Sequence, residues 1–298
     1  MKTRLSWLLL PAAAVLAATV AVAQQAYPTA DAASQALVDA LGTDKADPDK
    51  LATVLGKQWR DYIPSDSVER KDVDAFLRRY QERHSIETGS DGKPHLVVGR
   101  EPWVLPVPLQ QSQGGWSFDL KGGVDEMRVR RIGNNELAVM QALRAYHDAQ
   151  TDYAKVDRDG DGVLEYAQKF VSSDGAHDGL FWADDDSGEI SPLGPLFGDE
   201  TPKGQWHGYH FRILDAQGPS APGGAYRYRI GNDMSRGFAL VAWPARYNDT
   251  GVMSFMISHE GEIFEKDLGA QGDRLARTMK SFDPDDSWNL DTPTAAAP

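Results

Sequence analysis

The sequence contains no cysteine in its 298 residues, which excludes disulfide bonds, a thiol nucleophile and zinc held by thiolates. Basic residues are also scarce, because 31 Lys and Arg stand against 44 Asp and Glu and leave a net charge of −13. A surface this acidic repels nucleic acid and anionic lipid and suits divalent cations. Without disulfides the fold depends on its core, which eight Trp, ten Tyr and ten Phe can supply.

Long apolar runs are absent except at the start of the chain. There the basic residues Lys2 and Arg4 precede an apolar run from Leu5 to Ala23, which ends in the small residues that a signal peptidase reads. We predict that residues 1–23 are a secretory signal peptide cleaved after Ala23, so that the mature protein is periplasmic or secreted and has no integral membrane segment. An uncleaved membrane anchor is the alternative, although the run is rich in alanine and interrupted by Pro11.

The clearest motif is the alternation of aspartates with other residues in the segment DRDGDGVLE at 157–165. In a calcium loop of the EF-hand type, positions 1, 3 and 5 supply side-chain oxygens, position 7 a backbone carbonyl, position 9 a further ligand and position 12 a bidentate acid. The corresponding residues are Asp157, Asp159, Asp161, Val163, Glu165 and Gln168. Gly162 stands where the chain must turn, and Leu164 where an aliphatic side chain packs such a loop onto the core. We predict a structural Ca²⁺ site here.

Position 12 departs from the calcium-loop pattern, since Gln168 offers one neutral oxygen where a carboxylate offers two. Weak binding is therefore expected, with a dissociation constant of roughly 10⁻⁴–10⁻³ M, as in extracellular modules. A solvated acidic turn is the alternative, because Asp-Gly pairs form turns without metal. Mg²⁺ is less suited, since it prefers a tight octahedral shell that keeps its waters. A second acidic run, Asp184–Asp186 with Glu189, is interpreted as a solvated surface or as a source of additional ligands.

No motif in the chain identifies a reaction. It has no nucleophile elbow, no zinc-protease helix and no phosphate-binding loop. The paired carboxylates of a glycoside hydrolase remain open, because their spacing is spatial and not sequential. The leading catalytic candidates are His177 and Asp178, in an irregular segment close to Trp182, where active residues often occur. A structural or surface role is the alternative for this histidine, and we favour a non-enzymatic protein.

The first part of the chain is predicted to be a small unit of helices followed by strands, within residues 24–125. Apolar spacing predicts helices over Asp31–Leu41, from Asp47 to about Trp59, and over Val68–His84. Short apolar segments between turn residues then predict strands at Leu96–Gly99, Trp103–Val107 and Gly115–Asp119.

The second part, residues 126–282, is predicted to be an α+β unit in which a long helix packs on an antiparallel meander. Gly133 to Glu136 indicates a helix start, and an apolar face continues to Tyr153, with a short helix expected over Tyr166–Phe170. The expected strands are Tyr209–Leu214, Ala225–Ile230, Gly237–Trp243, Gly251–Ser258 and Glu262–Lys266. Residues 283–298, polar and then rich in Ala and Pro, are predicted to be a disordered tail.

The mature chain resembles the domain of unknown function 2950 family over its whole length. The segments that carry the resemblance are Val98–Pro108, Gly115–Asp119, Arg131–Leu137, Asp178–Trp182, Ser191–Leu196 and Tyr209–Leu214 with Gln217–Pro219. The resemblance implies an exported bacterial protein of Gram-negative type. It implies no activity.

Residues 134–268 also resemble, more faintly, the globular heads of type IV pilin-like proteins and pseudopilins. Those heads have a helix similar to Asn135–Tyr153, followed by a small sheet similar to Gly208–Phe211, Ala225–Tyr228 and Gly261–Phe264. This chain has no prepilin-peptidase site and no long apolar helix leading into Asn135, so we do not expect it to polymerise as a pilus does. The resemblance concerns the fold and carries no function by itself.

The sequence therefore favours an exported, non-enzymatic binding or envelope-associated accessory module with one structural Ca²⁺ site. Its partner class is an envelope protein or a glycan, and nucleic acid is disfavoured by the acidic charge. The alternative is a periplasmic hydrolase that acts on cell-wall or glycan material through His177 and Asp178.

Overall fold

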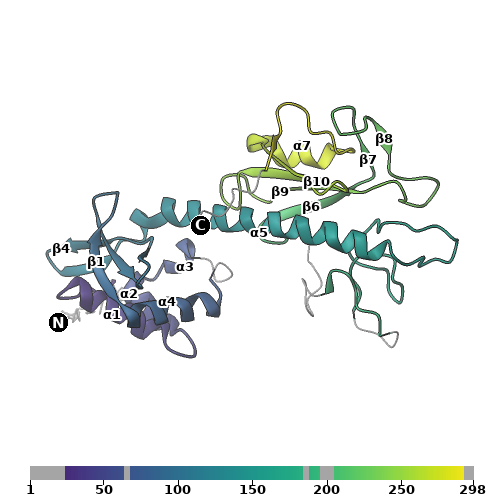
Figure 1. Ribbon diagram of the computed structural model, residues 1–298. Coiled ribbons are helices and arrows are strands. Elements are labelled where there is room, and N and C mark those ends of the chain that lie inside the picture. Colours follow the sequence, from purple (N-terminus) through teal and green to yellow (C-terminus); the bar gives the residue numbers. More distant parts are fainter. Residues whose placement is uncertain (1–23, 64–67, 184–187, 195–204, 292–298) are drawn as a thin grey trace, which may run out of the picture. The chain divides into compact units, whose positions relative to one another are not determined.

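A computed structural model describes residues 24–63, 68–183, 188–194 and 205–291 (Figure 1). The predicted signal peptide lies outside the described residues. The chain divides into two compact units, Met1–Val124 and Asp125–Pro298. Both contain helices and antiparallel sheets, so the α+β class predicted from the sequence is confirmed.

The first unit begins with helices whose starts are set by polar caps. The Thr29 hydroxyl accepts a hydrogen bond from the Ala32 backbone N–H, and the Asp47 carboxylate accepts two, from Asp49 and Lys50, directly before a proline in the first helical turn. These helices are α1 (Ala30–Leu41), α2 (Pro48–Leu55), α3 (Trp59–Tyr62) and α4 (Arg70–Glu82). The predicted second helix therefore ends earlier than expected, because Gly56 takes a positive φ of 96° and terminates it.

Two small antiparallel sheets follow these helices, as the helix-then-sheet prediction requires. Their strands are β1 (His84–Thr88), β2 (Pro94–Val98), β3 (Trp103–Val104), β4 (Leu109–Ser112) and β5 (Gly115–Phe118), with a short 3-10 helix, η1 (Lys121–Gly123), after them. The order is β1-β2-β3 in one sheet, and β4 pairs with β5 in the other. Tyr80 of α4 packs on Leu96 and Val98 of β2, and this cluster joins the last helix to the central strand.

The second unit is organised by α5 (Val124–Tyr153), a helix of 30 residues of which all but the first belong to this unit. It begins ten residues before the predicted start at Asn134. Asn135 and Glu136 do not cap a helix here, because their side chains bond instead to the backbone at Thr250 and at Val252 and Met253. Asn135 and Glu136, whose side chains are typical of helix starts, therefore lie inside α5 and bond to residues outside the helix.

A five-stranded antiparallel sheet packs between α5 on one face and the short helix α7 (Gly272–Thr278) on the other (Figure 1). Its strand order is β12-β11-β10-β9-β6. The bounds are β6 (Tyr209–Leu214), β9 (Ala239–Pro244), β10 (Met253–Ser258), β11 (Ile263–Asp267) and β12 (Asn289–Leu290), with the 3-10 helix η2 (Gly269–Gln271) before α7. Tyr146 of α5 meets the edge of Phe238, and Arg212 of β6 donates to the carbonyls of Ala276 and Arg277 in α7.

Three sequence predictions about this unit are corrected. The expected strand Ala225–Ile230 contributes only β8 (Tyr226–Arg227), which pairs with β7 (Ala216–Gln217) outside the main sheet. The expected helix Tyr166–Phe170 does not form, because Tyr166 and Ala167 donate their N–H groups to Met234 and to the Gln150 side chain. The expected disordered tail is ordered at least to Asp291, since β12 pairs with β11; residues 292–298 lie outside the described residues.

No helix in the described ranges combines the length and the apolar character needed to cross a membrane.

The contact between Glu136 and the sheet gives a stability prediction. Glu136 Oε1 accepts hydrogen bonds from the Val252 and Met253 backbone N–H groups at 2.8 and 2.9 Å. Glu136→Ala leaves both donors without this acceptor and is expected to lower the free energy of unfolding by about 1–3 kcal/mol. Urea denaturation measures the change. The control is Glu126→Ala, which removes an exposed i,i+4 pair with Arg130 in the same helix and should cost about 0.5 kcal/mol or less. Equal effects of the two variants would contradict the assigned role of Glu136.

Candidate metal centre

The acidic loop begins after α5 ends at Tyr153, and its course is set by two glycines. Gly160 and Gly162 have φ values of 78° and 91°, a region that side chains with a Cβ rarely adopt. A Cβ at either position would meet no atom within 4 Å, so the backbone conformation and not steric crowding requires glycine here. The turn predicted at Gly162 is present, and it folds the chain back over Asp157.

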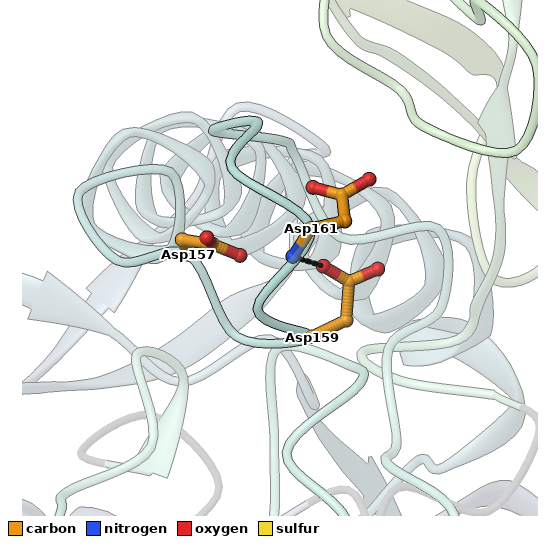
Figure 2. A group of neighbouring side chains, drawn as sticks. All are labelled: Asp157, Asp159 and Asp161. Atoms are coloured by element: carbon orange, nitrogen blue, oxygen red, sulfur yellow. Dashed lines mark hydrogen bonds between the residues drawn. The ribbon is translucent and has the colours of Figure 1, made fainter.

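The three aspartates of the loop point into this turn. One carboxylate oxygen from each of Asp157, Asp159 and Asp161 lies within 4.8 Å of those of the other two. Figure 2 shows the three side chains around one turn of the loop, with Asp159 joined to the backbone N–H of Asp161. Backbone N–H groups of Gly160 and Gly162 also donate to Asp157, at 2.8 and 2.9 Å. The loop backbone therefore orients the carboxylates before any ligand is present.

These hydrogen bonds also set the charge of the loop. The Gly162 and Gly160 N–H groups hold the pKa of Asp157 below its usual value, because they stabilise the carboxylate. Glu165 behaves in the opposite way. Partial burial raises its pKa, and the nearby negative charges of Asp159, Asp233 and Asp161 raise it further. The carboxylates thus repel one another at this end of the loop, and a divalent cation would relieve that repulsion.

Asp233 is a member of this acidic group that the sequence analysis missed. It comes from the loop between β8 and β9, and it raises the pKa of Glu165. Its separation from the motif by 68 positions along the chain gives no local signal. The contact arises because the backbone of Tyr166, next to Glu165, bonds to Met234, next to Asp233.

Other predicted ligand positions are placed differently. Val163 donates its N–H to Asp161 at 2.8 Å, which continues the turn. Gln168 donates from its side-chain amide to the Asn232 carbonyl at 2.6 Å, so part of this side chain is engaged outside the loop. Leu164 was expected to pack the loop onto the core, but it is 56 % exposed and does not. The chain leaving the loop is held by backbone bonds instead, and so needs no apolar anchor at this position.

Arg158 anchors the loop in place of Leu164. Its side chain is only 9 % exposed, and its guanidinium pairs with Glu189 at 2.9 Å. The same group lies over the rings of Tyr153 and Trp182, at 4.5 and 5.4 Å from their centroids. The sequence analysis assigned no role to this position, which stands between two aspartates of the motif. Alternation explains its burial: the aspartates share one side of the turn, and the residue between them faces the other side, toward the core.

The catalytic candidates lie beside this anchor. The His177 ring stacks on Trp182 at 4.2 Å, and its Nδ1 lies 3.0 Å from the carboxylate of Glu189. Asp178 bonds to Lys169 and Ser173. Burial raises the pKa of Asp178, but these bonds outweigh it and the net shift is downward. His177 and Asp178, although adjacent in sequence, therefore bond to different groups. The run Asp184–Asp186 lies outside the described residues. Glu189 interacts with Arg158 and His177.

The fold and the loop together define an α+β protein with one acidic cluster, among the residues that the structure describes, whose geometry could hold a metal ion. Residues 24–290 match the family model described as "Protein of unknown function (DUF2950)", and the chain belongs to this family. The resemblance to this family noted in the sequence is thereby confirmed. No curated protein and no solved structure matches the chain, so the resemblance to pilin-like heads stays a prediction.

The anchoring role of Arg158 can be tested with Arg158→Lys. Lysine keeps the charge but cannot stack a planar guanidinium on two rings, so we expect the free energy of unfolding to fall by about 2 kcal/mol. The near-UV circular dichroism of the tryptophans should also change, because Trp182 loses the guanidinium that lies over its ring. Lys155→Ala is the control, since it removes an exposed cation paired with Asp152 just before the loop. If Arg158→Lys changes the free energy of unfolding and the near-UV circular dichroism no more than Lys155→Ala does, the anchoring role of Arg158 is wrong.

Proposed function

We propose that the protein is an exported, non-enzymatic binding or envelope-associated accessory module that holds one structural Ca²⁺ in the loop from Asp157 to Gln168. The observation that carries this proposal is the gathering of carboxylate oxygens from Asp157, Asp159 and Asp161 within 4.8 Å on a loop already shaped by its own backbone bonds. Oxygen ligands of this kind are those that Ca²⁺ prefers.

Calcium suits this loop better than magnesium. The carboxylates are exposed or half-buried and sit on a glycine-containing turn, so they can adjust to the irregular shell of six to eight oxygens that Ca²⁺ accepts. Mg²⁺ demands a near-ideal octahedron and retains its waters. Weak binding is expected, because Gln168 is neutral and offers one oxygen where a carboxylate offers two.

A structural role for the ion follows from what the loop is attached to. Arg158 ties it to Tyr153 at the end of α5 and to Trp182 in the next segment. An ion that fixes the aspartates would also fix the residue between them, and thereby the packing of these rings. No step of a reaction is required of the cation in this proposal.

Export is supported by the position of the family match. It begins at residue 24, directly after the apolar run interpreted as a signal peptide, as expected if that run is removed from the mature protein. Loss of Lys2 and Arg4 with that segment would make the remainder still more acidic than the net charge of −13. An envelope protein or a glycan is the proposed partner class, and nucleic acid is disfavoured.

Calorimetric titration of residues 24–298 with Ca²⁺, after treatment with a chelator, tests the metal site. Binding is expected with a dissociation constant of roughly 10⁻⁴–10⁻³ M. Asp159→Ala should abolish the heat of binding. Asp152→Ala is the matched control, because it removes the same charge from an exposed side chain that pairs only locally with Lys155, and it should bind as the wild type does. If the folded wild-type protein shows no heat of Ca²⁺ binding, the loop is a solvated acidic turn and not a metal site.

Thermal unfolding at two pH values supplies a second readout of the same site. In the metal-free protein the raised pKa of Glu165 means that its ionisation costs stability as the pH rises through that pKa. Calcium should remove this cost, so its stabilising effect is expected to be larger at neutral pH than near the pKa of Glu165. At about 10 mM Ca²⁺ the stabilisation at neutral pH should be about 1–3 kcal/mol. A pH-independent effect would show that Glu165 takes no part.

A hydrolase acting on cell-wall or glycan material is the second candidate function, and one contact favours it. His177 lies 3.0 Å from Glu189 and stacks on Trp182, an arrangement of a base, an orienting carboxylate and an aromatic ring. If this candidate is right, the wild-type protein will release soluble fragments from purified peptidoglycan and His177→Ala will not. If the accessory role is right, neither protein will release fragments, and the wild type will be indistinguishable from a buffer control.

A further inference from the structure

A pocket lies on the face of the five-stranded sheet that α7 covers, away from the acidic loop. Its volume is about 160 Å³. The walls come from three places: the turn after β9, the strand β10, and the segment from η2 into α7. The residues that the argument uses are Ala245, Tyr247, Ser254, Gly269, Ala270 and Asp273.

Ser254 lines this pocket, and its hydroxyl has no hydrogen-bond partner among the residues that the structure describes. The residue is 1 % exposed, and its Oγ is a buried polar atom for which the described part of the chain supplies neither donor nor acceptor. Buried hydroxyls are normally satisfied, because an unpaired one costs the free energy of its desolvation. Ser258 lies on the same strand and is similarly buried, yet it accepts a hydrogen bond from the Glu260 N–H. Of these two buried serines of β10, the one whose hydroxyl has no partner is therefore the one that lines the pocket.

Asp273 supplies a fixed acceptor among the residues that line the pocket. Its Oδ1 accepts from the Trp243 indole N–H at 2.8 Å and from Arg277 Nε at 2.9 Å, whereas Oδ2 has only the shared contact with Arg277 Nε at 3.0 Å. The bonds from Arg277 and Trp243 lower the pKa of Asp273, so the group is ionised. A carboxylate oxygen accepts about two hydrogen bonds, and Oδ2 therefore has capacity left for a ligand donor.

Tyr247 and a group of small residues shape the remaining space. The Tyr247 hydroxyl donates to Asp267 at 3.1 Å, which fixes the ring while leaving the residue 39 % exposed. Gly269 borders the pocket with a φ of 68°, and a Cβ there would meet no atom within 4 Å. A volume of 160 Å³ is close to the roughly 150 Å³ of an engineered cavity that holds one six-membered benzene ring, and it is well below that of a drug-sized site.

We propose that this pocket binds a neutral, polyhydroxylated ring of monosaccharide size, either as a free sugar or as the end of a glycan. Ser254 can both donate to and accept from a ligand hydroxyl, while Asp273 accepts from a second one and Tyr247 offers an aromatic face. A cationic ligand fits less well, because Arg277 already neutralises Asp273. An anion fits less well, because Asp273 is ionised. The proposal does not depend on Ca²⁺ in the acidic loop.

Saturation-transfer NMR on residues 24–298 tests this site with D-glucose, D-galactose and N-acetyl-D-glucosamine at about 10 mM, since ligands this small bind weakly. We expect at least one of these probes to bind. Ser254→Ala should weaken that binding about tenfold through loss of one hydrogen bond, and should leave the fold intact because the hydroxyl has no partner to lose among the described residues. Ser258→Ala, on the same strand but outside the pocket lining, should bind as the wild type does.

A second variant keeps the test independent of Ser254. Ala270 is exposed at the rim of the pocket, so Ala270→Leu should fold normally and reduce binding by occupying the entrance. The disaccharides of the same sugars distinguish the two ligand sources. Tighter binding of a disaccharide supports the end of a glycan, and equal binding supports a free sugar. Absence of binding by every sugar, binding that survives both pocket variants, or binding of lysine in place of the sugars would each overturn the proposal.

Discussion

The second unit depends on the contact between the first half of α5 and the turn that joins β9 to β10. Arg131 pairs with Asp249, Asn135 donates to the Thr250 carbonyl, and Glu136 accepts from two backbone N–H groups beyond it. These polar contacts fix one end of the helix against the sheet, and buried aromatic side chains complete the packing toward Tyr153. The position of the acidic loop follows, because it begins just after α5 ends. The same turn, on its other side, contributes Ala245 and Tyr247 to the pocket.

Local pattern predicted most of the fold. Four of the main sheet's five strands, β6, β9, β10 and β11, were expected within two residues of their observed bounds, since apolar runs between turn residues are a local signal. The start of α5 was wrong because Asn135 and Glu136 have the chemistry of a cap but serve the sheet, a use that depends on residues more than a hundred positions away. The predictions of a helix at Tyr166–Phe170 and of a disordered tail that includes β12 were wrong for the same reason, because partners distant in sequence decide the conformation of both segments.

In the candidate site too, some residues could be predicted from local sequence and others could not. The spacing of Asp157, Asp159 and Asp161 is visible in the sequence because all three act within one turn. Arg158 and Asp233 contribute through tertiary contacts and left no local pattern. Glu189 was noted only as part of an acidic run, and its pairing with Arg158 is likewise a tertiary contact. The pocket beside Ser254 had no sequence signal at all, since its walls come from three separated segments and its defining property is a hydroxyl without a partner. Unsatisfied polar groups can be recognised only after the surrounding fold is known.

The burial of Arg158 means that the acidic loop is not a portable module. A nine-residue insertion of DRDGDGVLE into another protein would transfer the carboxylates and the glycine turn but not Tyr153, Trp182 or Glu189. The buried cation would then face water or an unmatched surface, and the turn would lose its fixed orientation. A transplant that keeps the orientation of the loop would therefore have to carry the arginine together with its two aromatic rings and its carboxylate.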